Sequence, residues 1–188
     1  MLNNEAKLMK DVLIYEDGHM RRTKHILMVH SLAKAIGGEE GLSIEQQQVV
    51  QGAAILHDIA IKVCKEKYND ASLKNQQIEA PSIAKKFLTT SNYMPSYIDQ
   101  ILELIYYHHD YSKNRGITHQ ILIEADLIVN CLESQFPSEK ASQISKYFRT
   151  KTGRELLNRL IGHSQSLDFS TLYETHMKKY NIQIKEHS

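Results

Sequence analysis

The sequence predicts an all-α fold, and three observations support this expectation. Apolar residues recur every three to four positions along most of the chain, which is typical of helices that bury one face. Only 3 prolines and 8 glycines occur in 188 residues, so few positions break a helix. No segment competes with these helices through the alternating pattern of a half-buried strand. We therefore expect a helical bundle.

The expected helix boundaries follow from local signals. Asp17-Gly18 separates the first two helices, and Gly37-Gly38 is expected to end the second. Ser43, with Gln46 three residues later, predicts a capping box at the start of the third helix, which carries a His-Asp pair towards its end. Residues 67–77 are polar and are predicted to form a loop. The other helices are expected over residues 3–16, 19–36, 81–89, 95–108 and 118–134, with short helices starting at Ser138 and Thr152 and a further one over 170–180.

Size and composition indicate one soluble domain. A chain of 188 residues with 41% hydrophobic content can bury one core and is short for two, so we assign residues 1–188 to a single domain with a weakly patterned tail over 164–188. Lys and Arg total 23 against 22 Asp and Glu, and no basic tract occurs, which argues against nucleic acid or an anionic membrane as partner. The oligomeric state stays open.

The N-terminal pattern and the two cysteines both favour a cytoplasmic protein. The first residues lack a cationic region followed by an apolar run, and no segment approaches the roughly 18 apolar residues needed to span a bilayer. Cys64 and Cys131 lie in apolar helical patterns, which fits small buried side chains in a reducing compartment better than a disulfide. We therefore expect a cytoplasmic protein without a membrane partner.

The pair His57-Asp58 is the most informative feature of the chain. In AAILHDIA it places two metal-ligand side chains next to each other in an apolar helix. About 100° of rotation separates neighbouring residues of a helix, so both side chains can reach one ion from adjacent edges of a single face. A carboxylate taken out of water is costly unless a partner compensates it, which favours a metal ligand over a packing role.

His25 and Asp126 extend this set, because both lie among apolar residues at helical spacing. Each has a structural alternative: a core histidine bonded to a carbonyl, or a carboxylate paired with a lysine or hydroxyl. Two imidazoles and two carboxylates form a mixed nitrogen and oxygen set suited to manganese, iron, cobalt, nickel or magnesium. We therefore expect a divalent metal ion at His25, His57, Asp58 and Asp126.

The order His, then His-Asp, then Asp resembles the HD superfamily of metal-dependent phosphohydrolases. The resemblance covers residues 17–163 and is strongest in RRTKHILMVHSLAKAIG, AAILHDIAIK, LIYYHHDYS and ILIEADLIVN. Two further stretches, QQIEAPSIAKKFL and YFRTKTGRELL, resemble small stand-alone bacterial HD proteins. The resemblance implies an HD-type helical bundle that hydrolyses a small phosphorylated molecule, with a nucleotide as the leading candidate.

The wider family pattern adds a central histidine and a later histidine pair, which together build a second metal site. The pair is present as His108-His109, but the central histidine is expected near Gln76, Gln77 or Glu79, where none occurs. This departure favours a single metal ion. Glu79 is then predicted to be the general base, with a second-metal ligand and a structural carboxylate near a helix N-terminus as its alternatives. His108 and His109 are predicted to bind substrate.

Cationic side chains should hold the phosphate of such a substrate. Lys62 lies four residues after Asp58, which places both on one face of an unbroken helix. Arg22 lies three residues before His25. Both cations are predicted to bind substrate, and Lys62 joins Asp58 and Glu79 in the predicted catalytic set. The alternative for each cation is an ordinary solvated surface charge.

Two other functions stay open. A degenerate HD domain would bind nucleotide as a sensor or partner module, but its metal ligands would then be dispensable, and all four are intact. A diiron oxygenase would use the two-metal version of the same scaffold, which the missing central histidine disfavours.

Overall fold

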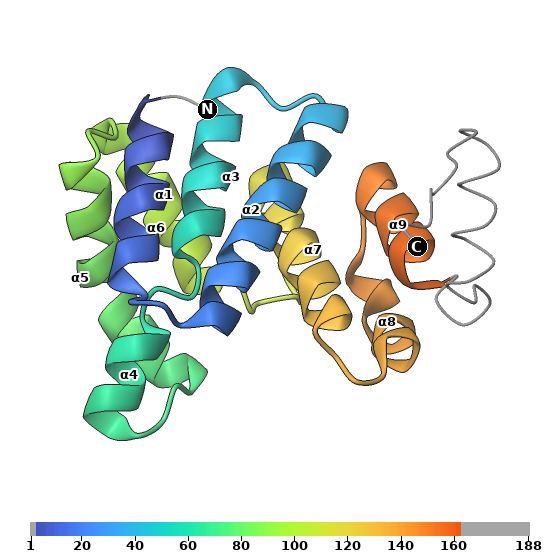
Figure 1. Cartoon of the computed structure of the whole chain (residues 1–188). Coiled ribbons are helices and arrows are strands. Elements are labelled where there is room, and N and C mark those ends of the chain that lie inside the picture. The colour runs from blue at the N-terminus through green and yellow to red at the C-terminus, as the bar shows by residue number, and fades with distance from the viewer. Residues whose placement is uncertain (1–2, 163–188) are drawn as a thin grey trace, which may run out of the picture.

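The computed structural model describes residues 3–162, which form a bundle of helices (Figure 1). No strand occurs within this range, so the predicted all-α fold is confirmed. In chain order the elements are α1 (Asn3–Tyr15), α2 (Met20–Glu39), α3 (Ile44–Leu56), α4 (Ile61–Tyr68), α5 (Leu73–Thr90), α6 (Pro95–Tyr107), α7 (Ile117–Leu132), α8 (Pro137–Ile144), a 3-10 turn (Ser145–Tyr147), α9 (Lys151–Leu157) and a π-helical turn (Asn158–Gly162).

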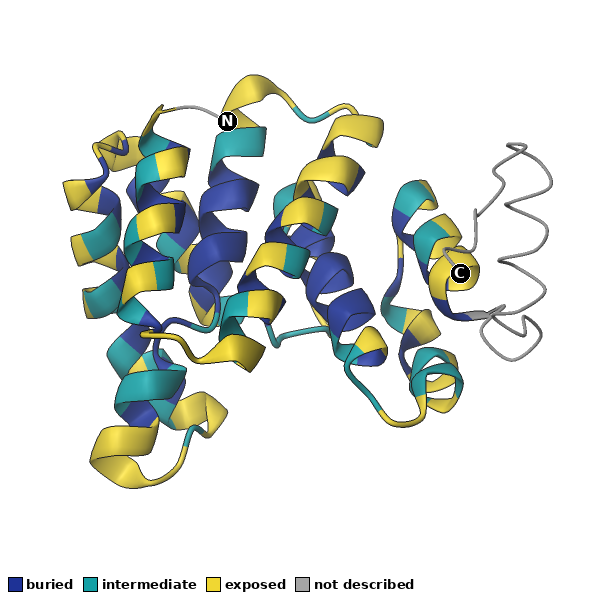
Figure 2. Ribbon diagram, in the orientation of Figure 1, coloured by how far each residue is buried: buried dark blue, intermediate teal, exposed yellow. Residues whose placement is uncertain are grey.

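Helices α3 and α7 form the centre of the bundle. Every residue from Val49 to Leu56 of α3 is buried, and so is every residue from His119 to Val129 of α7 (Figure 2). A helix that is buried on all sides needs neighbours on all sides. Accordingly α3 packs against α1, α2, α6 and α7, and α7 also packs against α2, α8 and α9. The chain segments that carry the predicted metal ligands therefore meet around α3 and α7.

Two of the predicted boundaries are confirmed. Asp17 and Gly18 both adopt positive φ, 51° and 74°, and separate α1 from α2. Ser43 and Gln46 form the capping box: each side chain accepts a hydrogen bond from the backbone N–H of the other. This box fixes the start of α3 and thereby the register that carries its end to His57.

Other boundaries were wrong. Gly37-Gly38 does not end α2, which continues to Glu39, and the chain turns at Gly41 with φ 71°. Most of the predicted 67–77 loop is helical: α4 runs to Tyr68 and α5 begins at Leu73, with Pro81 inside it. In the first turn of α5, Leu73 and Lys74 are exposed and the buried Gln76 is polar, so no apolar face marks this turn in the sequence. The expected tail over 164–188, with its helix over 170–180, lies outside the described residues.

Two general expectations can also be compared with the structure. Cys64 and Cys131 are buried free cysteines, as expected. Between residues 3 and 162, no helix combines the length and the hydropathy that crossing a membrane requires.

Candidate metal centre

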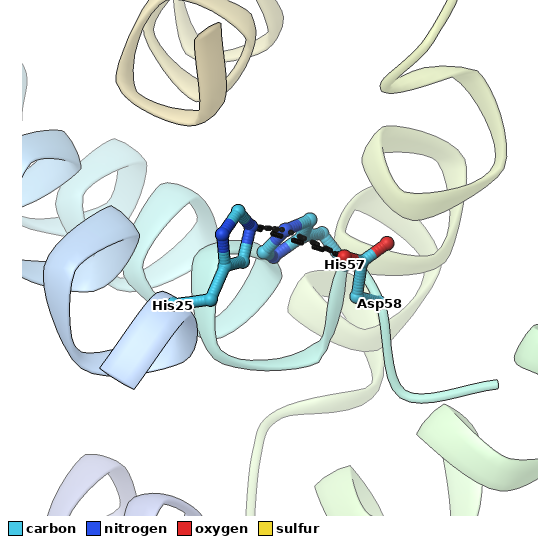
Figure 3. A group of neighbouring side chains, drawn as sticks. All are labelled: His25, His57 and Asp58. Atoms are coloured by element: carbon cyan, nitrogen blue, oxygen red, sulfur yellow. Dashed lines mark hydrogen bonds and ion pairs between the residues drawn. The ribbon is translucent and has the colours of Figure 1, made fainter. Parts of the chain in front are cut away.

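The predicted metal ligands come together from three places in the fold. His25 lies in α2, His57 and Asp58 lie directly after α3, and Asp126 lies in the buried part of α7. The chain leaves the helical path at residues 57–60, where the N–H of Ile59 donates to the carbonyl of Leu56 at 3.0 Å. This turn points the His-Asp pair toward α2, and Figure 3 shows His25, His57 and Asp58 facing one another.

The donor atoms of these four residues converge. His25 Nε2 lies 3.1 Å from His57 Nε2 and 3.1 Å from Asp126 Oδ1. Asp58 Oδ2 is 3.8 Å from His25 Nε2 and 3.6 Å from His57 Nε2, and His57 Nε2 is 3.7 Å from Asp126 Oδ1. His25, His57 and Asp58 offer ligand atoms that all lie within 4.8 Å of one another, so one ion can contact all three.

A second group of potential ligands shares Asp58 with the first. Asp58, His108 and His109 also offer atoms within 4.8 Å of one another, and His108 Nε2 lies 3.7 Å from Asp58 Oδ1. The two histidines occupy the turn after α6, which packs against α3. No residue from the Gln76–Glu79 segment belongs to this group. The missing central histidine therefore does not remove a second place for an ion.

The histidines present the same nitrogen to the centre because their other nitrogen is occupied. Nδ1 of His57 bonds the carbonyl of Ala54 at 2.9 Å, and Nδ1 of His108 bonds the carbonyl of Ile105 at 2.6 Å. Nδ1 of His25 bonds Glu133 Oε1 at 3.3 Å. A carbonyl can only accept, so Nδ1 of His57 and Nδ1 of His108 carry the proton, and Nε2 of each keeps a lone pair for a metal ion. That tautomer is the one a metal ligand requires.

The donor set fits a divalent cation. Asp126 Oδ2 and His108 Nε2 are buried polar atoms without a hydrogen-bond partner in the described structure. Leaving such atoms unsatisfied costs about 1–3 kcal/mol each, which a bound ion would remove. Asn130 Nδ2 donates to Asp126 Oδ1 at 2.8 Å and thereby fixes the carboxylate. The mixture of imidazole and carboxylate ligands suits a divalent metal ion.

Electrostatics hold Asp58 and His109 in the forms that bind metal. Burial raises the pKa of Asp58, but the adjacent His57 and His108 outweigh burial, and the net pKa is lowered. Burial, followed by the neighbouring His108, lowers the pKa of His109 to about 4. Burial lowers the pKa of His25, but its hydrogen bond to Asp126 and the neighbouring carboxylate charges together outweigh burial, and the net pKa is raised. Asp58 is therefore anionic and His109 neutral at pH 7, which are the forms of these side chains that bind a cation.

A cavity of about 410 Å³ opens beside the centre, and Asp58 and His25 line it. This volume is in the range of sites for small molecules, about 300–1,000 Å³. Both acidic and basic side chains line the cavity. The charged and titratable lining residues are Glu16, His19, Arg21, Arg22, His25, Asp58, Lys65 and Glu133.

The sequence model of the HD domain family matches residues 22–186. The chain belongs to the HD domain family. Its helical fold and its histidine and aspartate groups are those of a metal-dependent phosphohydrolase type of protein. No curated protein and no solved structure matches the chain.

Of the two cations predicted to bind phosphate, Arg22 lines the cavity. Its Nε donates to Glu16, a carboxylate that is only 2% exposed. A neighbouring pair joins Arg21 Nε to Glu133 Oε2 at 3.6 Å. Arg22 is thus held in place by a buried acid, which compensates part of its charge.

The structure does not support the predicted role of Lys62. Its Nζ donates to the carbonyl of Tyr15 at 2.8 Å and lies 4.8 Å from the centre of the Tyr15 ring, and it does not line the cavity. The physical reason is the turn at residues 57–60. Because the helix is interrupted there, the four-residue spacing from Asp58 no longer places Lys62 on the same face.

The prediction that Glu79 acts as general base is also unsupported. Tyr68 Oη donates to its Oε1 at 2.6 Å, and Lys67 Nζ donates to its Oε2 at 2.9 Å. The hydrogen bond from Tyr68 and, to a smaller extent, the one from Lys67 lower the pKa of Glu79. Glu79 belongs to neither ligand group and does not line the cavity. Glu79 lies on α5, and its bonds to Lys67 and Tyr68 link α5 to α4.

Sequence reasoning missed the residues that orient the ligands. Asn130 and Glu133 lie four and seven residues after Asp126 on α7 and its C-cap, so they share its helix face. That spacing could have identified both. Lys65 was also missed, because an unbroken helix after Asp58 was expected and that helix favoured Lys62 as the lysine nearest the site.

Proposed function

We propose that this HD domain hydrolyses a small phosphomonoester, such as a nucleotide, with divalent metal ions at the histidine and aspartate centre. The observation that carries the proposal is the orientation of Asp58. Its Oδ2 lies near His25 and His57, and its Oδ1 lies near His108. A carboxylate placed in this way suits two ions that share it, so His108 and His109 are better explained as metal ligands than as substrate ligands.

Under this proposal, His25, His57, Asp58 and Asp126 hold one ion, and Asp58, His108 and His109 hold the other. Bound there, such ions supply activation of water and neutralisation of phosphoryl charge. The protein fixes the imidazoles through their Nδ1 bonds and fixes Asp126 through Asn130. Asp58 is the carboxylate of the set that also borders the cavity, so substrate is expected to meet the centre at this residue.

Arg22 has a positioning role in this proposal. Its guanidinium is anchored at Nε by Glu16, which leaves its terminal N–H groups for a phosphate in the cavity. Charge-assisted hydrogen bonds from a fixed guanidinium orient a phosphoryl group without any proton transfer. Arg22→Ala is therefore expected to weaken substrate binding while metal content stays unchanged.

The experiment is a screen of the manganese-loaded protein against nucleotides and sugar phosphates, with release of inorganic phosphate as readout. We expect release that EDTA abolishes and that Asp58→Asn lacks. Nucleotide binding without release, retained in Asp58→Asn, would instead identify a sensor or partner module. Oxygen uptake by the iron-loaded protein without phosphate release would identify an oxygenase.

A further inference from the structure

The cations that line the cavity differ in whether an acid compensates them. Arg22 is bonded to Glu16, and Arg21 lies 3.6 Å from Glu133. For Lys65, which is exposed on α4, no carboxylate partner occurs among residues 3–162. The ammonium group of Lys65 is thus the lining charge that is most available to an incoming anion.

The turn after Asp58 determines which lysine faces the cavity. Helix α4 begins at Ile61, and Ile61 and Lys65, four residues apart, share the helix face that lines the cavity. Lys62 is rotated by about 100° from Ile61 and reaches Tyr15 instead. Because α4 starts directly beyond the turn that carries Asp58, Lys65 and Asp58 border the same space.

We propose that Lys65 binds the charge of the phosphoryl group and makes the site selective for phosphomonoesters over phosphodiesters. This inference rests on the proposed function. Near neutral pH a monoester carries close to two negative charges, since its second pKa is about 6, whereas a diester carries one. The attraction between an uncompensated ammonium group and a phosphate is stronger for the monoester dianion than for the diester monoanion. For an arginine that is already paired with a carboxylate, this difference in attraction is smaller.

The test compares two chromogenic probes on the manganese-loaded protein: p-nitrophenyl phosphate, a monoester, and bis(p-nitrophenyl) phosphate, a diester. Lys65→Ala should raise the KM for the monoester by about tenfold or more, the loss expected for one charge-assisted contact, with a smaller change in kcat. The diester should be affected less. Lys65→Arg keeps the charge and should recover most of the monoester KM.

A binding measurement accompanies the kinetics. Inorganic phosphate should inhibit Lys65→Ala with an inhibition constant raised by the same factor, and the thermal stabilisation by phosphate should shrink. Lys85→Ala is the matched control, because Lys85 is an exposed lysine on α5 that does not line the cavity. It should behave as wild type, and circular dichroism should show that all variants are folded.

Two results would overturn the assignment of Lys65 alone. One is a folded Lys65→Ala with the wild-type KM and phosphate inhibition. The other is a Lys62→Ala variant that raises the KM for the monoester while Lys65→Ala does not. If the wild-type protein neither cleaves the probes nor is stabilised by phosphate, the proposed function fails, and this inference fails with it.

Discussion

Asp58 is the most accessible of the four residues first expected to bind one ion. Its side chain is 22% exposed, compared with 10% for His25, 3% for Asp126 and none for His57. His57 and Asp126 do not line the cavity, whereas Asp58 and the less exposed His25 do. An incoming substrate is therefore expected to approach the centre mainly at Asp58.

Glu79→Gln tests whether the base lies outside the metal centre. Because Glu79 is engaged by Lys67 and Tyr68, we expect kcat to stay within about threefold of wild type. Loss of a true general base would lower kcat by about 10² to 10⁴. Steady-state kinetics with p-nitrophenyl phosphate measures the difference. A fall of a hundredfold or more at unchanged metal content would restore Glu79 to the reaction.

Glu133→Ala tests the orientation of His25. Without the carboxylate, Nδ1 of His25 loses its acceptor, and the affinity for Mn²⁺ should fall by about 10- to 100-fold. Glu133→Gln keeps a carbonyl oxygen in the same place and should retain most of the affinity. Calorimetric titration of metal into the metal-free variants gives both values. Equal affinity in Glu133→Ala and wild type would show that His25 needs no such support.

At the scale of elements, Glu124 joins α7 to α9. This fully buried carboxylate accepts hydrogen bonds from Gln120 Nε2 at 2.7 Å, from the N–H groups of Arg149 and Thr150, and from the Thr150 hydroxyl. Thr150 is also the N-cap of α9, where it accepts from the N–H of Gly153 at 2.9 Å. The stretch YFRTKTGRELL thus has a structural role in docking α9.

Gly153→Ala should destabilise this junction. A Cβ at Gly153 would overlap the Glu124 carboxylate and lie 2.8 Å from Thr150 Oγ1. Overpacking of this kind costs about 1–3 kcal/mol, so thermal unfolding should shift down by several degrees. Gly38→Ala is the control: the nearest atom to its Cβ would be 3.8 Å away, and alanine favours the helix. Equal melting temperatures for the two variants would argue against the tight junction.

The elements also show which features a sequence can and cannot reveal. The capping box at Ser43 and the turn at Asp17-Gly18 were predictable, since each depends on local hydrogen bonds or on a positive φ. The start of α5 was not, because its first turn buries no apolar residue that would mark it in the sequence. The break at residues 57–60 has no glycine or proline to mark it. Because of that break, Lys62 lies on a different face from the one expected and reaches Tyr15.

At the scale of the whole molecule, the candidate ligands join segments that are far apart in the chain. His25, Asp58, His108 and Asp126 come from α2, the turn after α3, the turn after α6, and α7. An ion bound to them in the native state and absent from the unfolded chain stabilises the fold by mass action, by about 2.7 kcal/mol at a hundredfold excess over the Kd. Binding and stability are therefore linked.

Removal of metal should lower the melting temperature of the wild-type protein. At that stabilisation we expect a shift of roughly 5–10 °C between protein in excess Mn²⁺ and protein in EDTA, measured by scanning calorimetry. Asp58→Asn, which leaves neither ion a full ligand set, should show a much smaller difference between the two conditions. A melting temperature independent of EDTA in a protein that demonstrably binds metal would contradict the linkage.

The number of metal ions per chain tests the central claim most directly. After loading with Mn²⁺ and removal of free metal, elemental analysis should find two ions per chain in wild type, about one in His108→Ala, and close to none in folded Asp58→Ala. This order follows from the two ligand groups that share Asp58. A folded Asp58→Ala variant with the metal content of wild type would contradict the account.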